Sequence, residues 1–262
     1  MSYFVICLVA LVVSTLTLFS GFGLGTLLMP AFAIFFDVEL AIAATAVVHL
    51  ANNLFKASLI GSRADFNIVA RFAVPAFLGA AVGAWLLGEI AGLPTLYRYH
   101  LGAREFELTV IKLVVAVLIA AFAILEITPR FKDGAFERKY VPLGGLLSGF
   151  FGGLSGHQGA LRSAFLIRAG LEKEAFIGSV VACAVVVDIS RLTVYGATFF
   201  PRHFSTLAAE GGMGLLLAGS LAAFAGSFIG VRLLKKVTMR NVRNIVAAML
   251  WLLAIALGTG WI

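Results

Sequence analysis

Charged side chains are scarce in this chain. Only 13% of its 262 residues are charged, whereas 61% are hydrophobic, and so many apolar side chains cannot all be buried in one soluble core. The composition therefore predicts a multi-pass integral membrane protein. The net charge of +7 does not indicate a nucleic-acid partner, because Lys and Arg lie mainly in short connections between apolar runs, where they orient a protein in the bilayer.

Cysteine is also rare. Cys7 and Cys183 both fall within apolar segments, which favours packing roles over a disulfide framework or a metal site. We expect no metal and no cofactor. No Lys or Arg precedes Lys56, so the first apolar run lacks the basic start of a secretory signal peptide. We expect that run to be part of the folded protein and the N-terminus to lie outside the cytoplasm.

Glycine is plentiful in two stretches of membrane-length apolar sequence, Ser148–Ser163 and, more weakly, Ser20–Pro30. Glycine is unfavourable in helices, so we interpret both stretches as breaks. Non-helical backbone at membrane depth requires protein or a water-filled cavity around it, and such breaks form the binding sites of transporters. The glycines assigned to the breaks are Gly21, Gly23, Gly25, Gly152, Gly153, Gly156 and Gly159.

Six further apolar stretches have the length of about 20 residues that a helix needs to cross a bilayer. They are Leu40–Gly61, Phe72–Gly92, Leu108–Ile127, Phe176–Phe199, Gly212–Val231 and Asn244–Trp261. The two regions that contain the glycine stretches, Phe4–Phe36 and Val141–Ile167, are too long for one helix. Each is a tilted helix, a broken helix, or a hairpin that enters the membrane and returns.

The two halves of the chain resemble each other, at nearly constant offset up to Gly61 and at changed offsets beyond it. The matched residues are Gly25–Leu28 with Gly159–Arg162, Asn53 with Asp188, Lys56 with Arg191, Gly61 with Gly196, Gly79 with Gly226, and Lys112 with Arg243. A repeat of this length predicts two copies of one structural unit, as many transporters have.

Loop charge indicates how the copies are oriented. If each broken region crosses the membrane once, the loop Lys and Arg divide almost evenly between the two faces. If each instead returns to its own side, Arg98, Arg104 and Arg202 lie on one face and the other 13 on the opposite face, as the positive-inside rule expects. Each half then makes three full crossings, so the copies are inverted, both termini are periplasmic, and the two hairpin tips approach each other.

The predicted fold class is therefore an all-α integral membrane protein of two inverted repeats, each a glycine-broken helical hairpin plus three transmembrane helices. The first repeat spans residues 1–127, a cytoplasmic linker spans 128–140, and the second repeat spans 141–262. Whether the broken segments are re-entrant or full spans stays open, as does whether the chain forms a homo-oligomer.

Ionisable residues inside a membrane are costly, so each is a functional candidate. His49, Asn52/Asn53 and Lys56 follow an i, i+3/i+4, i+7 spacing that places them on one helix face. Together with bare glycine N–H groups and helix N-termini, the cations describe an anion site. The predicted substrate-binding residues are Lys56, Arg191, Arg162, Asn52, Asn53, His49, Ser155, His157, Gln158 and Asp188.

Several of these residues have a second interpretation. Lys56 and Arg191 could instead lie near helix ends and extend to the lipid headgroups. Arg162 either neutralises Asp188 as a structural ion pair or faces the ligand. His157, whose ordinary pKa of about 6.5 suits a proton carrier, could simply be hydrogen-bonded beside a loop, and the same holds for His49.

The glycine stretches Gly21–Pro30 and Gly149–Gly156, within a repeated helix plan that covers nearly the whole chain, resemble the TauE/SafE family of bacterial membrane transporters. The resemblance implies an inner-membrane permease or exporter for small anions such as sulfite and sulfonates, with no catalytic residue. Two departures indicate a subgroup: Ala164 stands where the first copy has Pro30, and the second stretch carries His157-Gln158 and Arg162.

Other functions compete with alternating-access anion transport. Gly153-Leu154-Ser155-Gly156 matches the nucleophile motif of rhomboid proteases, but such a serine needs a histidine within hydrogen-bond reach, and His157 is only two residues away. The remaining alternatives are an anion channel and a membrane scaffold that transports nothing. For the transporter, the expected partners are a small anionic substrate and the lipid bilayer.

Overall fold

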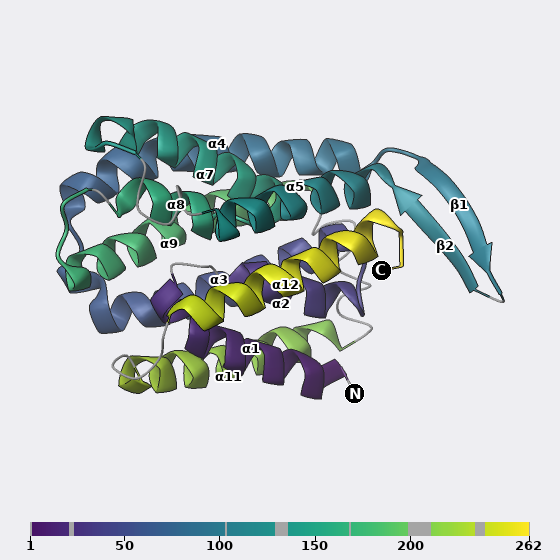
Figure 1. Ribbon diagram of the computed structural model, residues 1–262, viewed down its shortest axis with the longest axis horizontal. Coiled ribbons are helices and arrows are strands. Elements are labelled where there is room, and N and C mark those ends of the chain that lie inside the picture. Colours follow the sequence, from purple (N-terminus) through teal and green to yellow (C-terminus); the bar gives the residue numbers. More distant parts are fainter. Residues whose placement is uncertain are drawn as a thin grey trace.

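The protein is mostly helical in the computed structural model, which describes residues 2–20, 24–102, 104–128, 136–167, 169–198, 211–233 and 239–261. The elements are α1 (Ser2–Ser20), α2 (Leu24–Ala33), α3 (Val38–Ile60), η1 (Gly61–Arg63), α4 (Phe66–Ala91), β1 (Thr95–Leu101), β2 (Arg104–Thr109), α5 (Val110–Ile127), η2 (Arg138–Tyr140), α7 (Val141–Ser155), α8 (Gly159–Leu166), α9 (Lys173–Thr198), α11 (Gly212–Leu233) and α12 (Met239–Gly258). The helices lie roughly along one long axis (Figure 1).

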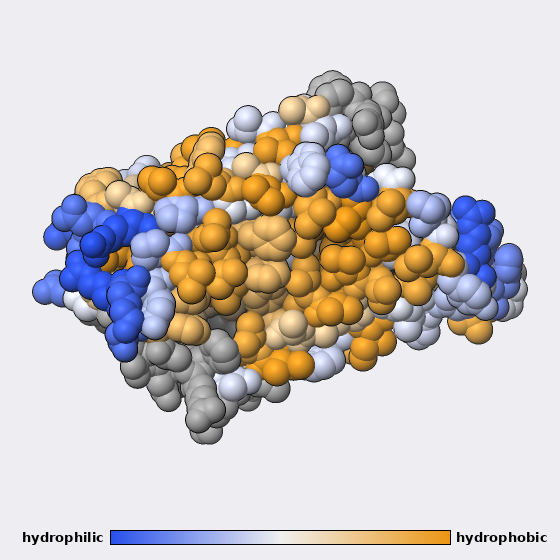
Figure 2. Space-filling model, turned by 90° about the horizontal axis from the view of Figure 1, so that it is seen from above, coloured by the Kyte–Doolittle hydropathy of each residue, from blue (hydrophilic) through white to orange (hydrophobic). Residues whose placement is uncertain are grey.

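Within the described residues, four helical segments are long and apolar enough to cross a membrane: Val38–Arg63, Phe66–Ala91, Lys173–Thr198 and Gly212–Gly230. They confirm four of the predicted spans as helices. The other two predicted spans correspond to α5 and α12, which contain shorter apolar stretches. Figure 2 shows a broad hydrophobic band on one face of the molecule, with hydrophilic residues gathered at its two ends.

A two-stranded sheet corrects the prediction that the chain is all-α. β1 and β2 pair antiparallel between α4 and α5, and the hairpin projects from the end of the helices at which both termini lie (Figure 1). Gly102 turns the chain with φ +65°, a conformation that glycine adopts without strain. The Tyr99 ring stacks on Phe106 across the strands at 5.4 Å, and such cross-strand aromatic pairs stabilise a hairpin.

Glycine allows α4 and α7 to pack backbone against backbone. Gly145, Gly149 and Gly153 recur every four residues on one face of α7, and a Cβ on any of them would overlap a backbone carbonyl oxygen of α4. Gly79 and Gly83 of α4 meet carbonyl oxygens of α7 in the same way. Small residues at this spacing let membrane helices approach closely. Much of the glycine in the second stretch therefore serves helix packing.

The break in the second glycine stretch is confined to Gly156–Gln158. Gly156 ends α7 with φ +80°, and its N–H donates to the carbonyl of Gly152 at 3.1 Å, so the residue acts as a left-handed C-cap. The prediction that Gly152 and Gly153 belong to the break is wrong, because both lie inside α7. Gly159 begins α8.

In the first stretch, α1 and α2 are separate helices and Gly25 is the second residue of α2. The predicted break residues Gly21 and Gly23 lie outside the described residues. Helix α1 packs along α11, and the Ser14 and Ser227 hydroxyls meet at 2.7 Å between them. Central contacts join α3 to α9 and α5 to α12, so elements from the two halves of the chain interleave.

Candidate functional site

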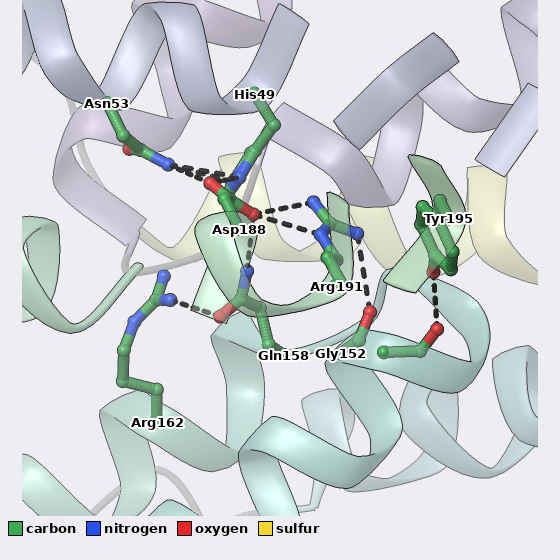
Figure 3. Close-up of polar contacts among 9 residues, drawn as sticks. His49, Asn53, Gly152, Gln158, Arg162, Asp188, Arg191 and Tyr195 are labelled. Carbon is green, nitrogen blue, oxygen red and sulfur yellow. Dashed lines mark hydrogen bonds and ion pairs between the residues drawn. The ribbon is translucent and has the colours of Figure 1, made fainter. Parts of the chain in front are cut away.

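A fully buried carboxylate, Asp188 on α9, is the centre of the polar network drawn in Figure 3. Its Oδ1 accepts from Arg191 Nε at 3.0 Å and Nη2 at 2.7 Å. Its Oδ2 pairs with His49 Nδ1 at 2.6 Å and accepts from Asn53 Nδ2 at 3.1 Å. Burying a charge is costly unless it is paired and hydrogen-bonded, and here both oxygens are satisfied by α3 and α9 together.

Gln158 connects this network to α8. Its Nε2 donates to Asp188 Oδ1 at 3.2 Å, and its Oε1 accepts from Arg162 Nη1 at 2.9 Å. The backbone carbonyl of Gln158 accepts from Ser148 Oγ at 2.9 Å, which fixes the break against α7. The amide therefore separates the Arg162 guanidinium from the Asp188 carboxylate, and Arg162 approaches the network from the opposite side to α3 (Figure 3).

Side chains of α9 also hold the C-terminal end of α7. Arg191 Nη1 donates to the carbonyl of Gly152 at 3.3 Å, and the Tyr195 hydroxyl donates to the carbonyl of Gly153. The Gly152 carbonyl also accepts from the Gly156 N–H, so Arg191 adds a second donor to it, and a cation at a helix C-terminus interacts favourably with the helix dipole. The ion pair of Asp188 and Arg191 is thus tied to the position of the break.

A second polar group surrounds the Asn52 amide. The Asn52 amide oxygen faces Lys56. It accepts from Lys56 Nζ at 3.2 Å and from Ser14 Oγ at 3.1 Å. The amide nitrogen donates to Ser227 Oγ at 2.7 Å and to the Ala223 carbonyl at 3.1 Å. This orientation satisfies both ends of the amide. Asn52 therefore holds the Lys56 ammonium against α1 and α11.

The two breaks meet beside His49. A Cβ on Gly25, at the start of α2, would lie 3.3 Å from the carbonyl oxygen of Gly156, 3.7 Å from Thr45 Cγ2 and 3.8 Å from His49 Cδ2. The start of α2, the end of α7 and the polar face of α3 are therefore in contact. The first tip itself, at Gly21 and Gly23, lies outside the described residues, so the approach of two hairpin tips stays a prediction.

Three buried polar atoms in this region have no hydrogen-bond partner among the residues that the structure describes: Thr45 Oγ1, His157 Nε2 and Arg162 Nε. Nearly all buried polar side-chain atoms are hydrogen-bonded in folded proteins, so each exception requires an explanation. His157 uses its other nitrogen, Nδ1, toward the carbonyl of Ser155 at 2.8 Å, and its ring stacks on Phe122. These atoms are available to a bound polar molecule.

All ten predicted substrate-binding residues are buried. The alternative that Lys56 and Arg191 extend to the headgroups is wrong for this structure, because their exposed fractions are 6% and 0%. The predicted ion pair of Arg162 with Asp188 is also wrong, since Arg191 occupies that position and Arg162 binds Gln158. Their role in substrate binding stays a prediction.

The geometry does not support a nucleophilic serine. Ser155 Oγ donates to the carbonyl of Phe151 in its own helix at 3.0 Å, and His157 reaches the Ser155 backbone rather than its hydroxyl. Among the described residues, no group of three or more His, Cys, Asp or Glu could hold a metal ion.

Sequence reasoning misses Thr45 and Tyr195. Thr45 lies four residues before His49 and Tyr195 lies four residues after Arg191, so both extend the polar faces of their helices by one turn. The i, i+4 spacing is the signal that could have found them.

A family model described as Sulfite exporter TauE/SafE matches residues 6–257, nearly the whole chain. No curated protein and no solved structure matches the chain. The match favours the transporter prediction over the serine protease, because this family is one of transporters and not of enzymes.

Proposed function

Because the chain belongs to the TauE/SafE family of membrane transporters, we propose that it carries small sulfur-containing or organic anions by alternating access around the site between its two glycine breaks. The observation that carries the proposal is the meeting of Gly25 and Gly156 beside buried cationic side chains. Broken helices at a repeat interface are where secondary transporters bind substrate. A bound anion would offset the cost of burying those cations.

Within this site, we assign different tasks to the cations. Arg191 is held by Asp188 and by the end of α7, so it positions the break. Lys56 and Arg162 have no carboxylate partner among the side chains that the structure describes. Arg162 Nε, moreover, is an unpartnered N–H donor. These two residues are therefore the proposed anion ligands.

The proposed architecture is a pair of inverted repeats. In such a pair, α1, α3 and α4 of the first half correspond to α7, α9 and α11 of the second. The contacts support this correspondence: α4 packs on α7 and α9, and its counterpart α11 packs on α1 and α3. Helices that lie at the centre, α3 with α9 and α5 with α12, pack on their own counterparts. A two-fold relation between residues 1–127 and 141–262 produces this pattern, and alternating access then exchanges the conformations of the two halves.

The orientation in the membrane is part of the same proposal. Both termini and the β hairpin lie at one end of the helices (Figure 1), which we place in the periplasm of a bacterial inner membrane. Single cysteines at His100 and Lys139, in a chain with Cys7 and Cys183 replaced by serine, test this placement. An impermeant maleimide should label the first from outside intact spheroplasts and the second only after lysis; labelling of both from one side would contradict it.

Transport itself is tested in proteoliposomes with radiolabelled sulfite and sulfonates. We expect saturable uptake that is lost in Lys56→Met and in Arg162→Met. Lys139→Met is the matched control, because it removes the same charge from an exposed side chain and should transport normally. Unchanged uptake in both site variants, or ohmic currents without saturation, would contradict the proposal.

A further inference from the structure

Buried charge in the site is unbalanced. Among the side chains that the structure describes, the buried ionised residues other than histidine are Lys56, Arg162, Arg191 and Asp188. Asp188 neutralises Arg191 through a two-point ion pair. With both histidines neutral, Lys56 and Arg162 remain as two positive charges without a buried counter-charge. Both cations lie around the same carboxylate: Arg162 reaches Asp188 through the Gln158 amide, and Lys56 follows Asn53, which donates to Asp188, by three residues on α3.

The imbalance follows from where the two halves of the sequence differ. Arg191 follows Asp188 by three residues, and the matching Lys56 follows Asn53 by three residues. An amide thus stands where the other half has a carboxylate, and Lys56 lacks the ion pair that Arg191 has. Arg162 matches Leu28 in the first half. Each difference adds one unpaired positive charge.

Nearby groups do not supply the missing negative charge. Arg162 donates to the side-chain oxygen of Gln158, and Lys56 donates to the side-chain oxygen of Asn52. Both acceptors are neutral amides, so neither supplies a negative charge. Cys183, on α9, is a buried free thiol and behaves as a small apolar group. The unpartnered Arg162 Nε and Thr45 Oγ1 are free to donate to an oxygen atom.

From this count we infer that the substrate bound in the site carries two negative charges, either on one oxyanion or on two acidic groups of one molecule. The inference rests on the proposed function and narrows its substrate class. A singly charged sulfonate would leave one buried cation uncompensated, which is costly in a low-dielectric site. A divalent anion balances both.

The test compares tetrahedral anions of similar size and different charge. Sulfate and methanesulfonate differ by one oxygen replaced with a methyl group, and sulfoacetate and ethanesulfonate make the corresponding pair for two separated acidic groups. Binding is measured by thermal stabilisation of the detergent-purified protein at constant ionic strength, because salt screens charge. The first pair asks whether one doubly charged group suffices, and the second asks whether the charges must be apart.

We expect the divalent member of at least one pair to bind at least about tenfold more tightly than its monovalent partner. Lys56→Gln should bring that ratio close to one while the variant still melts cooperatively, and Lys139→Gln should leave it unchanged. Equal binding of both members in each pair by the wild-type protein would overturn the inference but leave anion transport standing. Absence of transport for every anion would instead remove the proposed function itself.

Discussion

Asn53 on α3 donates a hydrogen bond to Asp188 on α9, with Nδ2 3.1 Å from Oδ2. The two residues occupy matching positions in the two halves of the sequence. Contact between counterparts is expected where a two-fold relation brings matching helices together. Their difference in charge, amide against carboxylate, is what leaves Lys56 unpaired while Arg191 is neutralised.

Substitution of Asn52 by aspartate should reduce the preference for divalent anions. The Asn52 amide oxygen accepts from Lys56 Nζ at 3.2 Å, so a carboxylate there would form the ion pair that Lys56 lacks and would lower the positive charge of the site by one. Asn52→Leu is the matched control: it removes the hydrogen bonds of the amide, at a cost of about 1–3 kcal/mol in unfolding free energy for each group left unpaired, but adds no charge. The ratio of sulfate to methanesulfonate affinity, measured by thermal shift, should fall in the first variant only.

Asp188→Asn should be strongly destabilising. Removal of one partner from a buried ion pair leaves the other charge uncompensated and typically costs about 3–5 kcal/mol. The double variant Asp188→Asn with Arg191→Met removes both charges and should recover part of that loss, since the two residues share one interaction. Thermal unfolding in detergent provides the readout. A double variant no more stable than Asp188→Asn would show that the pair does not act as a unit.

Gly149→Ala should disrupt the packing of α4 on α7. A methyl group there would overlap the carbonyl oxygen of Ala76, and backbone cannot move away as a flexible side chain can, so we expect overpacking costs of about 1–3 kcal/mol. Gly196→Ala is the control, because it lies in α9 with open space around its Cβ position and should be neutral or slightly stabilising. Melting temperatures that fall equally in both variants would contradict this account of the glycines.

Gly156→Ala should reduce transport by more than the loss of folded protein accounts for. The left-handed φ of +80° costs a residue with a side chain about 1–2 kcal/mol. Gly102→Ala introduces the same strain at φ +65° in the β hairpin, far along the chain from the breaks. Sulfite uptake should drop in the first variant and persist in the second when both are compared at equal amounts of folded protein. Normal uptake by Gly156→Ala would remove this break from the mechanism.

Sequence predicts the helices well because long apolar runs leave few other structures in a membrane. The shared face of His49, Asn53 and Lys56 follows from helical periodicity in the same way. The β hairpin is missed because Thr95–Thr109 separates two strong apolar runs, and the alternation in Tyr97-Arg98-Tyr99 is short beside them.

Partner choice within the polar network is beyond sequence. Spacing places Asp188 and Arg191 on one face, but whether Asp188 pairs with Arg191 or Arg162 depends on how α8 folds back after Gly156. Sequence also does not distinguish the two roles of glycine in α7. The glycines that pack against α4 and the one that ends the helix, Gly156, are the same residue type.

We propose that one anion binds both Lys56 and Arg162 within the buried polar network around Asp188. Selenate is a divalent tetrahedral oxyanion whose selenium can be located by anomalous scattering in crystals of the protein. We expect a selenium peak whose oxygens lie within hydrogen-bond distance of Lys56 Nζ and the Arg162 guanidinium, and its loss in Lys56→Gln. Bound selenate found elsewhere, with this position empty, would contradict the proposed site.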